Sequence, residues 1–426
     1  MEQNYPILEK VIIASLFVFA SFSVFSISAT QIAGGLGGLA WILRTHLTGI
    51  WKEQRWPLGV PFLLFAFASL VAVANAYDVS YSFESLKKLL EILIFFWVLN
   101  CVRENRLRDS LSLVLIASTT LAGLFGFYQV WRDGLSTGGG LRIEGAMSVY
   151  MTFAGILMMV ALLAYGRIFF RQPAPPWLWV AAGIITACLL LTLTRQAWFG
   201  FLIGLVFLIF FWRKKFLLLL PILVMATFLA SPEAVKTRLT DMISGKDVPF
   251  ATRVNLWQVG WKIFRDYPLT GCGFRCVDLV NDQYPDPLYE KSREPTQSIK
   301  HLRGMHNNFV QLAVDTGILG LTAWLGIWIC FFRLLYHRSK AIKRDPNECW
   351  VIYGSTAAVI AFLAGGGFET NFYDSEVAMV LFFIMALPFA GSQGERCNLD
   401  KNTSVSSRIQ KNYPLVFSLI LKKCKQ

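Results

Sequence analysis

His306 is the residue of this 426-residue chain best suited to acid–base chemistry. It stands in the run Met305-His-Asn-Asn-Phe-Val-Gln-Leu312, where an apolar helix is expected to begin. A neutral imidazole can act as a general base near pH 7. Asn307 and Gln311 lie four residues apart, on one face of the expected helix. We predict that His306 is catalytic and that Asn307, Asn308 and Gln311 support it, although an interfacial or capping histidine has the same spacing.

Three arginines lie at or near the ends of apolar runs. Arg195 separates two such runs, Arg142 follows the glycines at 138–140, and Arg253 opens a segment with helical spacing. An arginine between apolar runs is costly unless it is paired or faces water. Its guanidinium also matches phosphate in a bidentate manner. Together the three predict a pyrophosphate clamp, while each alone also fits a solvated or snorkelling charge.

Sequence motifs for metals and nucleotides are absent. There is no HExxH, no P-loop and no GxGxxG after a strand. Cysteines are scattered without zinc-type spacing, and Cys272 and Cys276 share one loop, where their spacing leaves pairing open. We expect no metal and no cofactor. A transferase here would then need a donor that carries its own leaving group, such as a lipid pyrophosphate.

The elements that position these residues are membrane-spanning helices. The chain is 55% hydrophobic with a mean hydropathy of +0.50, and only 16% of its residues are charged, against about a quarter in soluble domains. The charges cluster between apolar runs of spanning length, which predicts an all-α polytopic membrane protein with one domain over 1–391. The formal charge of +13 sits largely in short loops, so it favours membrane orientation over nucleic-acid binding.

Twelve spans are expected. Their approximate limits are 10–29, 31–43, 57–76, 86–102, 110–130, 148–168, 177–194, 196–212, 215–231, 307–332, 350–367 and 375–391. The short loops on one side hold sixteen lysines and arginines and those on the other side hold five. This excess marks the first side, with both chain termini, as cytoplasmic.

One long loop, 232–306, falls on the opposite, periplasmic side. It is rich in aromatic residues, and within 253–266 Val254, Trp257, Trp261 and Phe264 recur at helical spacing. This pattern predicts an amphipathic helix on the bilayer surface. The tail 392–426 is polar and basic, and we expect it at the cytoplasmic membrane surface.

Four segments, taken in this order, resemble the O-antigen ligase and polymerase superfamily of bacterial envelope glycosyltransferases. They are Thr194-Arg-Gln-Ala-Trp198, Thr252-Arg-Val-Asn-Leu-Trp257, Pro268-Leu-Thr-Gly-Cys-Gly-Phe274, and His306-Asn-Asn-Phe309 with Gly317-Ile-Leu-Gly320 after it. The resemblance covers about 140–330, and the twelve-span layout agrees outside it. The two cysteines at the third segment have no counterpart in the family pattern.

The resemblance implies a metal-independent, inverting glycosyltransferase of the C-type membrane fold in the bacterial inner membrane. Its donor would be a glycan on undecaprenyl pyrophosphate, and its acceptor a hydroxyl of the lipid A-core. His306 would be the general base, and Arg195 and Arg253, with Arg142, would hold the pyrophosphate at the periplasmic face.

Other functions fit the same pattern. The sibling polymerase transfers the growing glycan to another lipid-linked repeat, and a protein-glycosylating relative is a third form. A lipid-linked glycan transporter belongs to a different class, in which charged residues or broken helices near the midplane are usual. Glu91 and Asp315 are the acids that would serve it. We favour the ligase because the chain is compact, with no added periplasmic domain.

Overall fold

The described part of the chain is helical throughout. The computed structural model describes residues 5–134, 142–147, 149–243, 248–280, 283–284, 304–342 and 345–391. The predicted tail and parts of the predicted loop 232–306 lie outside these residues. Four helices are long and apolar enough to cross a membrane, namely α6 (Asn105–Asp133), α7 (Tyr150–Phe170), α14 (Asn308–Ala341) and α15 (Pro346–Gly365). The chain is an integral membrane protein.

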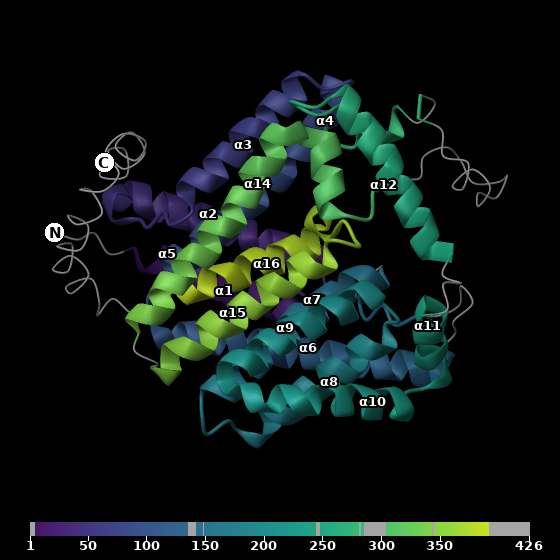
Figure 1. Cartoon of the computed structure of the whole chain (residues 1–426). Helices are drawn as coiled ribbons and strands as arrows, with labels where there is room; N and C mark the ends of the chain where they lie inside the picture. Colours follow the sequence, from purple (N-terminus) through teal and green to yellow (C-terminus); the bar gives the residue numbers. More distant parts are fainter. Residues whose placement is uncertain are drawn as a thin grey trace, which may run out of the picture.

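The other described α-helices complete the bundle (Figure 1). They are α1 (Pro6–Phe22), α2 (Ile27–Thr48), α3 (Gly59–Ala74), α4 (Val79–Ser85), α5 (Ile92–Cys101), α8 (Pro176–Leu191), α9 (Arg195–Arg213), α10 (Leu220–Ala230), α11 (Glu233–Ile243), α12 (Val248–Asp266) and α16 (Ser375–Ala386). Short 3-10 turns precede α5 and α10 at Leu86–Glu91 and Lys214–Leu219.

Helices α7 and α15 form the centre of the bundle. α15 packs against both α7 and α9, and α16 packs against α5 and α7. Small residues permit this close contact: a Cβ at Gly166 would lie 2.6 Å from the Cα of Gly354, and one at Gly200 would lie 2.5 Å from the carbonyl oxygen of Ala361. Without water to drive association, close backbone packing of this kind stabilises membrane helices.

Two predicted spans at the N-terminus have different limits in the structure. The span predicted over 10–29 is wrong, because α1 ends at Phe22 and α2 begins at Ile27. The hydroxyl of Ser26 accepts a hydrogen bond from the amide of Ala29 and so caps the new helix. This serine cap explains why a new helix begins here within an apolar run of the sequence.

α14 is broken near its start, where the sequence predicts a continuous span. Gly317 adopts φ 62° and ψ −163°, so the first turns of the helix leave the axis of the rest (Figure 1). The turn at 268–274 docks into this break: the amide of Ile318 donates to the carbonyl of Pro268 over 2.9 Å, and the amide of Cys272 to that of Val314 over 3.0 Å. We call this contact the clasp.

The clasp explains two of the four sequence segments. A Cβ at Gly271 would lie 2.4 Å from the backbone of Asp315, and one at Gly317 would lie 2.3 Å from the carbonyl oxygen of Leu269. Both glycines also have positive φ. Gly271 and Gly317 are therefore the two halves of one backbone contact.

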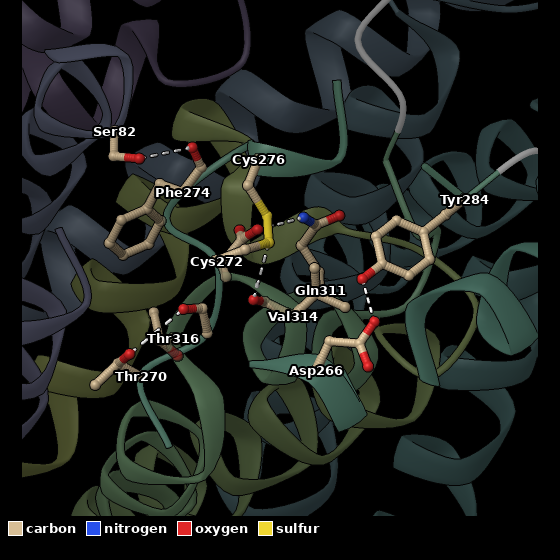
Figure 2. Close-up of a disulfide and its surroundings, with 12 residues drawn as sticks. Ser82, Asp266, Thr270, Cys272, Phe274, Cys276, Tyr284, Gln311, Val314 and Thr316 are labelled. Atoms are coloured by element: carbon tan, nitrogen blue, oxygen red, sulfur yellow. Dashed lines mark hydrogen bonds between the residues drawn. A yellow bond between two sulfur atoms is a disulfide. The ribbon is translucent and has the colours of Figure 1, made fainter. Parts of the chain in front are cut away.

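The clasp also carries a disulfide. The structure bonds Cys272 to Cys276, the pairing that the spacing left open. Figure 2 shows the bridge beside Gln311 of α14. Both cysteines are buried, in a small apolar cluster with Val259, Ile263 and Met305 among others.

α12 begins earlier than the predicted 253–266 helix, and a different face of it is packed. Leu256, Val259 and Ile263 are buried against the start of α14. Trp261 is 60% exposed and stacks on Phe264, with ring centroids 5.6 Å apart. Contact of that outer pair with a bilayer remains a prediction.

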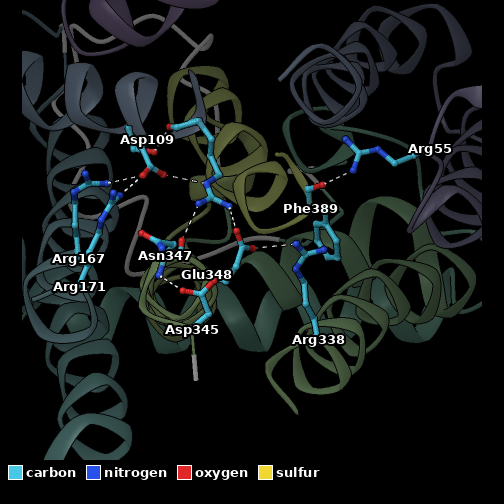
Figure 3. Close-up of polar contacts among 11 residues, drawn as sticks. Arg55, Asp109, Arg167, Arg171, Arg338, Asp345, Asn347, Glu348 and Phe389 are labelled. Carbon is cyan, nitrogen blue, oxygen red and sulfur yellow. Dashed lines mark hydrogen bonds and ion pairs between the residues drawn. The ribbon is translucent and has the colours of Figure 1, made fainter. Parts of the chain in front are cut away.

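A group of charged residues, the Arg108 cluster, lies at the C-terminal end of α14 (Figure 3). Its members are Arg108, Asp109, Arg167, Arg171, Arg338 and Glu348. Arg108 is fully buried and donates to Glu348 over 2.8 Å and to the carbonyl of Asn347 over 2.8 Å. The cluster joins α6, α7, α14 and α15.

Candidate functional site: a histidine–carboxylate pair among arginines

The site lies where α9, α12, α14 and α15 meet, at the end of the bundle opposite the Arg108 cluster. His306 immediately precedes the capping residue of α14, and Glu369 follows the end of α15. The Nδ1 of His306 lies 2.9 Å from Oε1 of Glu369. The two residues are 63 positions apart in sequence, and the helical hairpin of α14 and α15 brings them together.

This contact fixes which ring nitrogen of His306 is available for chemistry. An ionised carboxylate can only accept hydrogen bonds, so Nδ1 must carry the hydrogen. In the neutral ring Nε2 is then the basic nitrogen. Among the described residues it has no hydrogen-bond partner, and the His306 side chain is 37% exposed. The geometry therefore leaves Nε2 as the basic nitrogen of a partly exposed ring.

Glu369 receives hydrogen bonds from four donors. Besides His306, Arg253 and Gln196 approach its Oε2 at 3.3 Å each, and the amide of Thr370 donates to Oε1 over 3.1 Å. Burial alone would raise the pKa of this carboxyl. The hydrogen bond and positive charge of His306, together with the charge of Arg253, outweigh burial and hold the pKa below its ordinary value. Glu369 is therefore ionised at neutral pH.

The predicted supporting residues tie the start of α14 to the segment that carries Glu369. Asn307 caps α14 by accepting from two backbone amides and donates to the carbonyl of Gly367 over 2.8 Å. Asn308 is buried and donates to Asn371 over 2.6 Å, while its amide donates to the carbonyl of Gly366 over 2.7 Å. These bonds set the distance between His306 and Glu369.

The third supporting residue, Gln311, faces the other way. Its Oε1 accepts from the amide of Met305 over 2.8 Å, and its Nε2 donates to Asp315 over 3.0 Å. Asp315 is fully buried beside the clasp, and the histidine is oriented by Glu369.

The three predicted arginines lie at the same end of the bundle, in different surroundings. Arg253 contacts the site directly through Glu369. Arg195 is the first residue of α9 and is half-buried, next to Gln196. The guanidinium carbon of Arg142 lies 4.4 Å from the ring centre of Tyr150.

Tyr150 links Arg142 to the rest of the site. Its phenol interacts electrostatically with both Glu369 and Arg253. Arg142 stacks on this ring, an arrangement that arginine favours. All three arginines therefore border one region, and Arg253 forms an ion pair with Glu369.

Sequence reasoning missed Glu369 as a member of the site, as well as Gln196. Glu369 is absent from the predicted site residues. A signal was present: it follows Gly365-Gly-Gly-Phe368 at the end of an apolar span. A Cβ at Gly366 would lie 2.3 Å from Nδ2 of Asn308. Such a glycine run indicates close approach of another segment, here the His306 end of α14.

The fold and the site together define an integral membrane protein with an oriented histidine base beside arginines. Residues 180–325 match the family model for O-antigen ligase, and this range holds Arg195, Arg253 and His306. This segment of the chain is similar to the O-antigen ligase family.

One relative is the exopolysaccharide production protein ExoQ of Rhizobium meliloti (strain 1021). It is 28% identical over 110 residues, which are 26% of this chain and 24% of that protein. The match thus spans about a quarter of the relative's length.

Proposed function

We propose that the chain is an inverting, metal-independent glycosyltransferase of the ligase type. It transfers a glycan from undecaprenyl pyrophosphate to a hydroxyl of the lipid A-core during lipopolysaccharide biosynthesis. The observation that carries this proposal is the pair of His306 and Glu369, with the basic Nε2 on the open side and arginines at the same end of the bundle.

The reaction needs one base and one anion site. Nε2 of His306 takes the proton of the acceptor hydroxyl, whose oxygen forms a bond to the anomeric carbon of the donor sugar. The bond from that carbon to the pyrophosphate oxygen breaks, and undecaprenyl pyrophosphate leaves with the electron pair. Arginines at the site stabilise this anion, because preplaced charges need no reorganisation as the bond breaks. Attack opposite the leaving group inverts the anomeric centre.

Glu369 and Arg253 have complementary parts in this scheme. As His306 accepts the proton it becomes a cation, and the ionised Glu369 at 2.9 Å stabilises that cation. Arg253 uses one guanidinium nitrogen to bind Glu369. A guanidinium has five N–H donors in a planar arrangement. The remaining donors can serve a phosphate oxygen. Arg195 and Arg142 supply the other contacts of the proposed clamp.

Support for the membrane arrangement comes from the sidedness of the charges. Arg55, Arg108, Arg167, Arg171 and Arg338 belong to the loops counted as cytoplasmic, and each is held at or near the helix ends opposite His306. We propose the C-type membrane fold with twelve spans in the inner membrane, both termini in the cytoplasm and His306 at the periplasmic face.

A second candidate is a polymerase of the same superfamily, in which the acceptor is another lipid-linked repeat. The likeness to an exopolysaccharide production protein favours keeping it. The transporter is disfavoured by the clasp: the break in α14 at Gly317 is filled by the backbone of 268–274, not by a water-lined cavity.

The test uses His306→Ala and Arg253→Ala in cells that depend on this chain for the activity, with lipopolysaccharide separated on a gel. The matched controls are His337→Ala and Arg333→Ala, two exposed residues near the other end of α14. Loss of a general base costs about 10²- to 10⁴-fold in rate. A ligase defect leaves a core-only band and accumulates full-length lipid-linked glycan.

The other outcomes separate the alternatives. Core carrying a single repeat indicates the polymerase, and loss of a secreted polymer with unchanged lipopolysaccharide indicates an exopolysaccharide polymerase. Normal ladders from both site variants, with normal secreted polymer, would contradict the enzymatic proposal.

A further inference from the structure

His306 has an unusual backbone conformation. Its φ is +46°, in the left-handed region that residues with a side chain rarely adopt. Such a conformation costs free energy and persists only where the surroundings impose it. Neighbouring groups must therefore hold the backbone on at least one side of His306. On the C-terminal side this is the capped start of α14 at Asn307.

On the N-terminal side, both backbone groups of Met305 are held by side chains. Its amide donates to Oε1 of Gln311 over 2.8 Å, and its carbonyl accepts from Nε1 of Trp257 over 3.0 Å. The Met305 side chain is fully buried. A Cβ on Gly260 would lie 2.9 Å from its sulfur, so α12 closes on it without room to spare.

Trp257 lies one helical turn after Arg253 on α12, so the two side chains share a face of that helix. Arg253 binds Oε2 of Glu369, and Trp257 binds the backbone directly before His306. One helix thus holds both members of the histidine–carboxylate pair. Aromatic contacts seat the indole, with Phe250 at 6.3 Å and Phe368 at 6.0 Å between ring centres.

We infer that Trp257 is a positioning residue: its indole N–H, acting through the carbonyl of Met305, keeps His306 in the left-handed conformation that aims Nδ1 at Glu369 and Nε2 outward. The inference rests on the proposed function for its effect on rate, but not for its effect on the histidine ring. Without this bond the 304–306 backbone can relax toward ordinary φ, and the imidazole leaves its carboxylate.

The test is Trp257→Phe in the full chain, purified in detergent micelles with ¹⁵N-labelled histidine. Phenylalanine keeps an aromatic ring near Phe250 and Phe368 and removes the N–H together with part of the indole ring. Trp261→Phe is the matched control, since it makes the same change one turn further along α12 at a 60% exposed position. The His306 signals are assigned by their loss in His306→Gln.

In Trp257→Phe, we expect the imidazole of His306 to change from a single Nδ1–H tautomer to an exchanging mixture of tautomers. In Trp261→Phe, the His306 signals should match those of the parent protein. Polymer output in cells should fall about tenfold in Trp257→Phe, the size expected for one lost hydrogen bond that sets catalytic geometry. Gln311→Met removes the bond on the other side of Met305, and it should cause the same change in the ring spectrum.

Unchanged ring signals in both Trp257→Phe and Gln311→Met overturn the inference, even if His306→Ala is inactive. The converse case is equally distinct. If His306→Ala leaves polymer output normal, the proposed function fails, and the ring spectra still decide whether Trp257 positions the histidine.

Discussion

Two clusters of arginines and carboxylates lie at opposite ends of the same helices, and they differ in how completely they are closed. In the Arg108 cluster, Arg108 is fully buried and two carboxylates are shared among four arginines. At the other end, Glu369 is buried but its partner His306 is 37% exposed. The first arrangement leaves its central arginine inaccessible to a ligand, whereas the second keeps a basic nitrogen on the open side. Ion pairs of similar composition thus contribute cohesion at one end and, in the proposed mechanism, chemistry at the other.

The comparison predicts its largest effect for Arg108→Ala. Removal of one partner leaves Glu348 and Asp109 buried with less compensation, which costs about 3–5 kcal/mol in the free energy of unfolding. Thermal unfolding of the purified protein measures it, with the exposed Arg333→Ala as the control at the same end of α14. An Arg108→Ala protein as stable as the parent would remove the cohesive role. Activity per folded molecule should stay near the parent value.

Glu369→Gln should show the opposite pattern. Glutamine keeps the shape but cannot stabilise the imidazolium as a carboxylate does, so kcat should fall by about 10- to 100-fold, the range seen when a group that orients a histidine is removed. The unfolding temperature should change little, because the segment remains held by Asn307 and Asn308. Glu84→Gln, at an exposed position of α4, is the control. A loss of stability without loss of rate would place Glu369 with the cohesive group.

The same contrast explains what the sequence could predict. Apolar runs act over short distances in the chain, so they predicted the helical class, while the twelve spans and the periplasmic side of His306 stay predictions. Spacing alone does not tell which glycine of a run is packed. A Cβ at Gly37 would lie only 2.2 Å from Trp97, whereas Gly35 and Gly38 face open space.

Pairings between distant segments were not predictable in this way. Glu369 lies beside His306 because α14 and α15 form a hairpin. No local sequence pattern predicts that these two residues are close in space. Trp257 was read as part of an apolar stripe, yet its N–H is bonded to Met305. The break at Gly317 likewise needs its partner turn at 268–274 before it can be recognised.

A disulfide, Cys272–Cys276, lies at the end of the bundle that holds His306. Its removal should change stability and activity less than Arg108→Ala or Glu369→Gln does. Cys272→Ser with Cys276→Ser leaves the backbone bonds of the clasp in place. A bridge across so short a loop stabilises by at most about 2 kcal/mol. We expect a modest fall in unfolding temperature and a few-fold fall in activity, with Cys330→Ser as control. An activity loss as large as that of Glu369→Gln would show that the bridge, not the backbone contact, holds the start of α14.

The smallest effect concerns pH and decides which force dominates at Glu369. Its pKa lies below the ordinary value of 4.5, so its ionised form stabilises the fold. That contribution is complete above pH 4.5 and is lost as the pH falls through the lower folded pKa. The difference in unfolding free energy between the parent and Glu369→Gln should therefore stay constant from neutral pH to about pH 5 and shrink below it. If the parent instead gains stability relative to Glu369→Gln as the pH falls from about 7 to about 5, burial outweighs His306 and Arg253. Glu369 would then be neutral at working pH, and His306 would lack the anion that its protonation requires.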